Sequence, residues 1–68
     1  MIQVDARGLS CPEPVLLTLD ALDSANGEAV QVTVSDSNQR DNIMRQVERR
    51  KLTANVEKVG QDFVLTIE

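Results

Sequence analysis

Three valines spaced two residues apart constrain the fold most. Val30, Val32 and Val34 alternate with polar residues, and successive side chains of a β-strand point to opposite faces of its sheet. Residues 30–34 therefore predict a strand with one apolar face and one polar face. A sheet covered by helices on both sides would instead contain continuous apolar runs. Helices are thus expected on one face of the sheet only.

Three further segments follow the strand pattern, at residues 2–5, 54–56 and 63–68. Helical spacing fills the two long gaps, which gives the order βαβαββ. Because strand–helix–strand crossovers are nearly always right-handed, the first two strands are predicted to be parallel, and a turn at residues 60–62 makes the last pair antiparallel. The polar face of this sheet is expected to stay in solvent, with Gln3, Gln31, Thr33, Asn55 and Glu57 on it.

The predicted architecture is an α/β two-layer sandwich, with a mixed four-stranded sheet and two helices on one face. Residues 1–68 are expected to form a single domain, alone or within a longer protein. Asp36 and Gln39 approximate a capping box at the start of the second helix, and the cations Arg49, Arg50 and Lys51 are expected in its last turn. Helical spacing assigns these side chains to the core: Val15, Leu16, Leu19, Leu22, Ile43, Met44 and Val47.

The only cysteine, Cys11, stands where the strand pattern changes to the helix pattern, and Pro12, Glu13 and Pro14 follow it. Proline is tolerated in the first turn of a helix, where its missing N–H would have no partner. Unpaired N–H groups and the helix dipole favour an anion at such an end, so a thiolate there has a pKa below the value of about 8.5 for free cysteine. Gly8 gives the preceding loop the backbone freedom to present the sulfur.

Composition excludes several classes of function. One cysteine and no histidine rule out a disulfide within the chain, a zinc cluster and a Cys/His catalytic pair. The net charge of −4 disfavours binding to a phosphate backbone. No stretch approaches the roughly 20 apolar residues of a membrane span, and the N-terminus lacks the pattern of a signal peptide. The expected location is the cytoplasm.

The segment of residues 5–15 resembles the CPxP signature of the TusA/SirA/YedF-type sulfur carriers, and the length and element order are similar to that family's. The resemblance implies a fold similar to the C-terminal domain of bacterial translation initiation factor three. It also implies a sulfurtransferase-type relay. Cys11 would receive sulfur as a persulfide from a cysteine desulfurase or a rhodanese-like donor and pass it to an acceptor protein. Such a relay needs one accessible thiolate and no cofactor or metal.

The resemblance assigns supporting roles around Cys11 to Gly8, Pro12, Glu13 and Pro14. Arg40 and Asp41 are similar to an Arg-Asp pair of the thiouridine-pathway members, although exposed charge on a helix explains that pair more simply. The positions predicted for partner docking are Arg7, Arg40, Arg45 and Arg49.

Two alternatives stay open at this stage. Cys11 could be a small buried side chain, since free cysteine is among the most often buried residues. The chain could also be a regulatory or RNA-binding module, although fold analogy alone is a weak argument. A monomer that does not bind nucleic acid is expected. The sequence leaves the pathway open between tRNA thiolation, molybdenum cofactor, sulfur oxidation and selenium metabolism.

Overall fold

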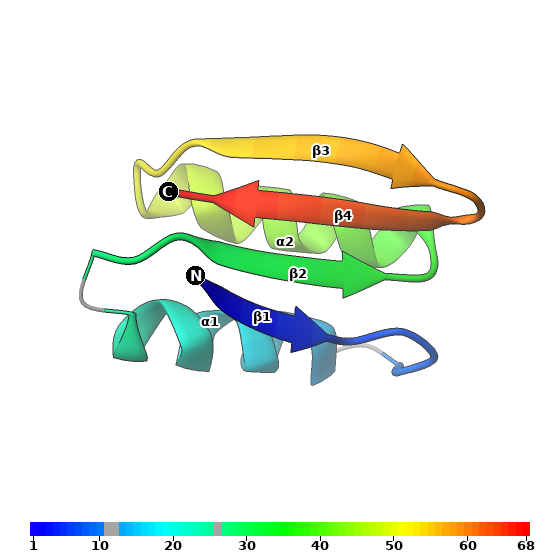
Figure 1. The fold of residues 1–68 in the computed structure, drawn as a ribbon, viewed down its shortest axis with the longest axis horizontal. Helices are drawn as coiled ribbons and strands as arrows, with labels where there is room; N and C mark the ends of the chain where they lie inside the picture. Colours follow the sequence, from blue (N-terminus) through cyan, green and yellow to red (C-terminus); the bar gives the residue numbers. More distant parts are fainter. Residues whose placement is uncertain (11–12, 26) are drawn as a thin grey trace.

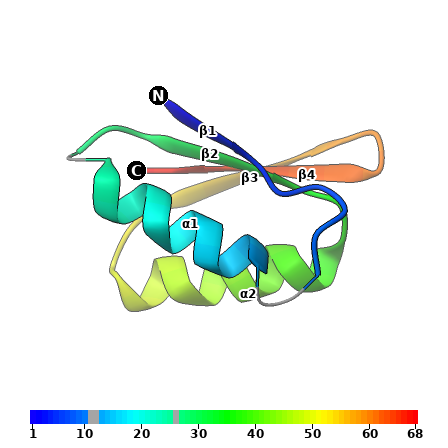
Figure 2. The ribbon, with the colours of Figure 1, turned by 90° about the horizontal axis from the view of Figure 1, so that it is seen from below.

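The computed structural model describes residues 1–10, 13–25 and 27–68. The sheet has the strand order β1-β2-β4-β3, and both helices lie on one face of it (Figure 1, Figure 2). The predicted two-layer βαβαββ sandwich is confirmed. Its elements are β1 (Ile2–Asp5), α1 (Glu13–Ser24), β2 (Val30–Val34), α2 (Ser37–Arg49), β3 (Ala54–Val59) and β4 (Asp62–Ile67).

β2 is paired along both of its edges. It runs parallel to β1, with Val4 opposite Val32, and antiparallel to β4, with Leu65 opposite Val32. β3 and β4 form the predicted hairpin, and their last pair is Val59 with Asp62. The turn is therefore one residue shorter than predicted. It begins with Gly60 at φ +63, a conformation that two-residue hairpin loops require and that glycine adopts without strain.

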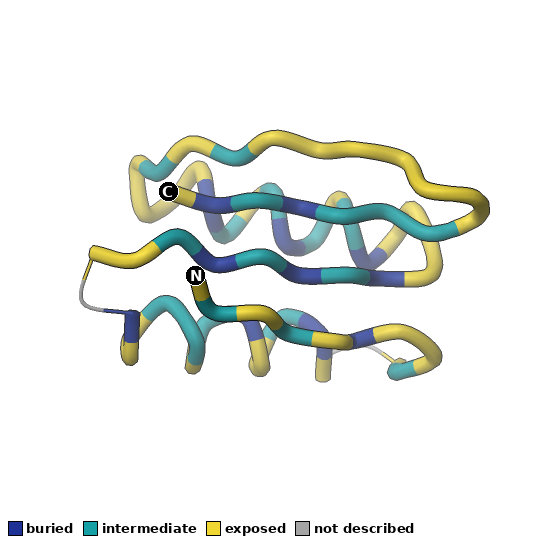
Figure 3. Tube along the Cα trace, in the orientation of Figure 1, coloured by how far each residue is buried: buried dark blue, intermediate teal, exposed yellow. Residues whose placement is uncertain are grey.

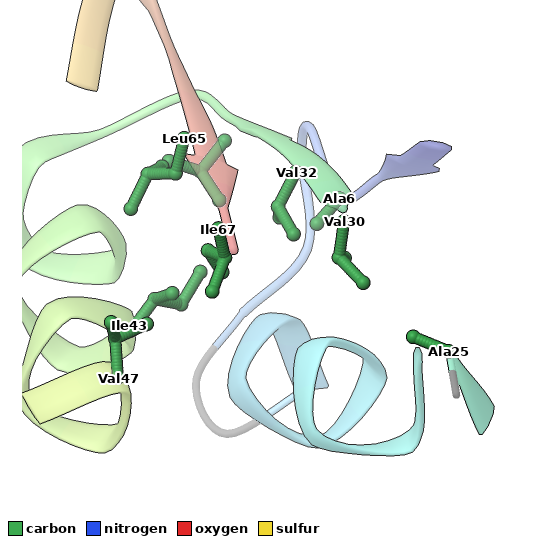
Figure 4. Packing of buried hydrophobic residues seen from close by; sticks show 9 residues of the cluster. Ala6, Ala25, Val30, Val32, Ile43, Val47, Leu65 and Ile67 are labelled. Atoms are coloured by element: carbon green, nitrogen blue, oxygen red, sulfur yellow. The ribbon is translucent and has the colours of Figure 1, made fainter. Parts of the chain in front are cut away.

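The core lies between β2, β4 and the two helices (Figure 4). Val30, Val32 and Val34 are completely buried, as their alternation predicted. Burial of each such side chain stabilises the fold by about 1.5–3 kcal/mol. α2 and β4 contribute further buried side chains, namely Ile43, Val47, Leu65 and Ile67.

The other face of the sheet carries the predicted polar side chains and no helix. Gln3 lies beside Gln31, and its Nε2 atom donates to the Gln31 Oε1 atom over 3.4 Å. Thr33 is half-buried, and Asn55 and Glu57 are exposed. None of the five is buried, so the prediction of a solvated face is confirmed (Figure 3).

The stripe by which α1 faces the core is shifted from the one that its hydrophobic spacing predicted. Val15 and Leu22 are half-buried and pack against the core as predicted. Pro14 and Thr18 are buried, whereas Leu16 and Leu17 are 53% and 39% exposed. Thr18 is tolerated inside because its hydroxyl donates to the Pro14 carbonyl oxygen over 2.8 Å, which satisfies the polar group locally. The assignment of Leu16 to the core was wrong.

α2 begins as predicted at Asp36, whose carboxylate accepts the Gln39 backbone N–H over 2.9 Å. Only half of the capping box forms, because the Gln39 side chain does not return a bond. Gln39 instead points inward on the same stripe as Ile43 and Val47, is 6% exposed, and its amide oxygen accepts no hydrogen bond from the residues that the structure describes. A buried, unsatisfied amide is costly.

α2 ends at Arg49, so the prediction that Arg50 and Lys51 belong to its last turn was wrong. Lys51 has φ 59, its N–H donates to the Glu48 carbonyl, and the Leu52 N–H donates to the Val47 carbonyl, each over 3.0 Å. These two bonds form a Schellman motif. The position with positive φ in this motif usually holds glycine, and lysine stands there at a cost in backbone strain.

Lys51→Gly is expected to raise the free energy of unfolding by about 0.5–1 kcal/mol, because glycine removes the strain of the left-handed conformation. Urea denaturation measures this change in the free energy of unfolding. Lys51→Ala removes the same charge but keeps Cβ, so it should give no comparable gain. Equal gains from both substitutions would show that the lost charge, rather than the backbone, is responsible.

Gln39→Met should raise the free energy of unfolding by about 1 kcal/mol, because it removes an unsatisfied buried amide and keeps an unbranched side chain. Gln46→Met is the matched control, since Gln46 is a half-buried glutamine on the same helix. Thermal and urea unfolding of both variants give the comparison. A loss of stability specific to Gln39→Met would mean that its amide is hydrogen-bonded in solution.

Candidate functional site

The described residues on either side of Cys11 and Pro12 lie at one end of the sandwich. Because β1 and β2 are parallel, their carboxyl ends meet at one edge of the sheet, and both helices start there (Figure 1). β4 also starts there, since Phe63 pairs with Val34. Open α/β sheets commonly bind their ligands at such an edge. We call this region the motif end and define it as residues 6–10, 13–14, 35–40, 58–59 and 62–63.

Cys11 and Pro12 lie outside the residues that the structure describes. Ser10 and Glu13, on either side of them, lie at the motif end, and the Glu13 N–H donates to the Ser10 carbonyl over 2.9 Å. Glu13 is exposed in the first turn of α1, and Pro14 is buried there. The predicted proline in the first helical turn is confirmed for Pro14. The presentation of the Cys11 thiol stays a prediction.

Arg7 donates hydrogen bonds to Asp5 from both its backbone and its side chain. The Nε and Nη2 atoms of Arg7 donate to the two carboxylate oxygens of Asp5, each over 2.9 Å, and the backbone N–H of Arg7 donates over 3.1 Å. The side-chain bonds, followed by the backbone bond, lower the pKa of Asp5 from 3.8 to about 2. The same carboxylate raises the pKa of Arg7. Both groups stay ionised throughout the pH range in which a thiol titrates.

This pairing changes the role expected for Arg7. Its guanidinium also lies 3.9 Å from the Asp62 carboxylate, so Arg7 ties the loop after β1 to the start of β4. Asp5 and Arg7 form a neutral pair, so together they add little net charge to the start of the loop after β1. Arg7 thus stabilises the loop after β1. To bind a partner protein, Arg7 would have to replace its contacts with Asp5 and Asp62 by contacts with that protein.

Gly8 connects the loop to the neighbouring strand–helix junction. Its φ is +76, and its N–H donates to the Ser35 hydroxyl oxygen over 3.1 Å. A Cβ atom at this position would meet no atom within 4 Å, so the need for glycine is conformational rather than steric. Sequence reasoning found Gly8 and missed Ser35, because nothing in the local pattern shows a contact between residues 27 positions apart.

The arginines predicted for docking are not all at the motif end. Arg40 lies there, in the first half of α2. Arg45 lies farther along, with its Nη1 atom 3.2 Å from the Asn42 side-chain oxygen. Arg49 is the last helical residue, and nine residues of α-helix separate it from Arg40 by about 13 Å along the axis. The structure therefore brings Arg7 and Arg40 to the motif end, but not Arg45 and Arg49.

A cation–aromatic cluster at the motif end was not predicted. The Arg40 guanidinium lies 4.7 Å from the centre of the Phe63 ring and binds Asp41 over 3.0 Å. The Lys58 ammonium lies 6.0 Å from the same ring. Lys58 and Phe63 are direct cross-strand partners, so the hairpin register contained the only sequence signal for this contact.

The solvated face of the sheet has a polar hollow of about 420 Å³, lined by Gln3, Val4, Asp5, Arg7, Gln31 and Thr33. It lies on the side of the sheet away from the helices. Among the residues that the structure describes, no cluster of acidic, histidine or cysteine side chains could hold a metal ion. Neither α1 nor α2 is long and apolar enough to cross a membrane.

Comparisons with known proteins agree with the fold and identify the family. The family model described as sulfurtransferase TusA matches residues 2–68. The crystal structure of a SirA-like protein from Desulfitobacterium hafniense is 32% identical, with a TM-score of 0.88 over 98% of this chain and 95% of that chain. No curated protein matches the chain. Since the family match covers almost every residue, the resemblance predicted from the CPxP segment is confirmed, and the chain belongs to the TusA sulfurtransferase family.

Proposed function

We propose that the chain is a sulfur carrier in which Cys11 carries sulfur as a persulfide between two proteins. Membership of the TusA family supports a sulfurtransferase role. One observation carries the finer proposal: Ser10 and Glu13, which flank the only cysteine, lie at the end of the sheet where both helices start. A helix start lowers the pKa of a cysteine thiol and increases the thiolate fraction.

Sulfur transfer by this route needs no other reactive group. The Cys11 thiolate attacks the outer sulfur of a persulfide on the donor, which is a cysteine desulfurase or a rhodanese-like protein. The sulfur–sulfur bond of the donor breaks, its cysteine leaves as a thiolate, and a new sulfur–sulfur bond forms on Cys11. The acceptor repeats the exchange, so electrons balance without an external oxidant. Thiols persist in a reducing compartment, and we propose the cytoplasm as the location.

The outward face of α1 is the proposed docking surface. Leu16 and Leu17 are exposed there although solvent-facing helix positions are normally polar. Glu13 and Asp20 lie on the same face by helical spacing, and α1 contains no Lys or Arg. A sulfur donor or acceptor with an apolar depression and a basic rim would complement this face.

The alternative of a nucleic-acid-binding module finds no matching feature at the motif end. Single-stranded nucleic acids are bound by open aromatic platforms. Phe63 is the sole aromatic residue of the chain, it is half-buried, and Arg40 lies over its ring. The ring is therefore occupied by the protein's own side chain.

Incubation with a cysteine desulfurase and cysteine, or with a rhodanese-like donor and thiosulfate, should add the mass of one sulfur atom to the intact chain. Cys11→Ser should remove this addition and leave the melting temperature close to that of the parent, because serine has nearly the same size as cysteine and is well tolerated near a helix start. Intact-mass spectrometry and circular dichroism measure the two quantities. A parent chain that stays unmodified with both donors would overturn the carrier proposal.

The double variant Leu16→Ser/Leu17→Ser should slow sulfur loading by a protein donor at least about fivefold, since apolar contact at an interface is lost. Its stability should change by no more than about 0.5 kcal/mol for each exposed site. Val59→Ser is the matched control, because Val59 is 54% exposed, like Leu16 at 53%, but lies on the hairpin strand β3. Equal loading rates for the double variant and the control would refute the docking surface.

A further inference from the structure

The charges of the chain are segregated, and this segregation points to a second docking surface. Residues 40–58 contain six of the seven Lys and Arg residues and only three acidic residues, whereas the chain as a whole has a net charge of −4. α1 contains acidic side chains and no basic ones. The molecule therefore has an acidic side at α1 and a basic side at α2 and the residues that follow it, to which β3 adds Lys58.

The basic side includes a part of the sheet that no helix covers. β3 pairs only with β4 and is exposed along nearly its whole length (Figure 3). Val56 pairs with Leu65, a core residue, so it lies on the helix side of the sheet, yet it is 42% exposed. α2 lies behind β4 rather than behind β3 (Figure 1). The helix layer thus stops one strand before the sheet does.

Two cations border this uncovered part at the motif end. Arg40 and Lys58 approach the Phe63 ring at 4.7 and 6.0 Å from its centre. Arg40 has Asp41 as a counter-ion at 3.0 Å. Lys58 makes no ion pair with any carboxylate in residues 1–10, 13–25 and 27–68. An incoming carboxylate would supply Lys58 with a counter-ion and relieve its repulsion with Arg40.

We propose that Arg40, Val56, Lys58 and Phe63, which we call the basic strip, bind an acidic amphipathic helix of a relay partner. This inference rests on the proposed function and adds the chemistry of one partner to it. The apolar stripe of the partner helix lies on Val56, beside the Phe63 ring that Arg40 covers, and its carboxylates face Arg40 and Lys58. The partner helix extends the helix layer over β3, next to α2.

A second copy of this chain is a poorer occupant of the basic strip. A symmetric contact through β3 would bring the strip close to its own cations, and like charges that face one another oppose association. The acidic helix α1 of another copy matches the strip in chemistry, but each copy has a net charge of −4, and this charge opposes association between copies. The proposed occupant of the basic strip is therefore a different, acidic protein, while a partner with a basic rim is proposed for α1.

The test is a titration of the isotope-labelled full chain by nuclear magnetic resonance with a synthetic amphipathic helix that has Glu on its rim and Leu on its apolar stripe. Amide signals of the basic strip should shift, and those of Arg50 and Lys51 should not. Lys58→Gln should weaken binding about two- to fivefold, the range for one partly exposed ion pair. Arg50→Gln, which removes a cation at the far end of α2, should leave the affinity unchanged.

Three results would overturn the proposal. Shifts spread over all basic residues would indicate diffuse attraction, and equal binding of a peptide with Lys in place of Glu would exclude carboxylate recognition. Shifts of the basic strip on raising the protein concentration alone would identify a second copy as the occupant. The titration gives the same answer in Cys11→Ser, so failure of peptide binding is distinct from failure of Cys11 to accept sulfur.

Discussion

Burial of one face of β2 is the constraint on which the remaining structure depends. Val30, Val32 and Val34 are fully buried, and the strand that carries them is hydrogen-bonded on both edges. The backbone groups of such a central strand are fully hydrogen-bonded only if β1 and β4 flank it, and its valines are buried only if helices cover its apolar side. The parallel pairing with β1 then forces α1 to cross the sheet, and both helices begin at the edge where the motif lies.

Elements whose pattern is strictly periodic were predictable from the sequence. The alternation along β2 and β4 fixed their inward faces, and the spacing of Ile43 and Val47 fixed the inward face of α2. α1 was misjudged at Leu16 because several leucines compete for the core while its buried positions are taken by Pro14 and Thr18. A threonine that bonds its own helix backbone is a local solution that hydrophobic spacing does not reveal.

The motif end was only partly predictable, for a different reason. Gly8 and Pro14 can be recognised from the local sequence, and both occupy their predicted places, in the loop after β1 and in the first turn of α1. Ser35, Lys58 and Phe63 act through contacts between distant parts of the chain, and a single sequence contains no direct record of such contacts. The end of α2 was misplaced because Lys51 occupies a position that glycine normally marks.

In the proposed relay, two partners would meet the chain at one sulfur atom, and the distribution of charge offers a physical basis for keeping them apart. α1 and the basic strip have opposite charge, and both extend from the motif end. Electrostatic complementarity controls the rate and orientation of encounter more than the final affinity. Partners of opposite charge would thus approach the same thiol from different sides, and neither would need to bind tightly.

The position of β1 has a consequence for the order in which the molecule opens. β1 is an edge strand of four residues that pairs only with β2, whereas β2 and β4 each pair with two strands, and β3 is joined to β4 by a two-residue turn. A short strand with one paired edge loses fewer hydrogen bonds and contacts when it opens than a central strand does. We expect β1 to detach first in native-state fluctuations, while β2, β4 and α2 remain packed. The loop before the cysteine is anchored by that strand, so the same local unfolding would alter the backbone next to the thiol without melting the core.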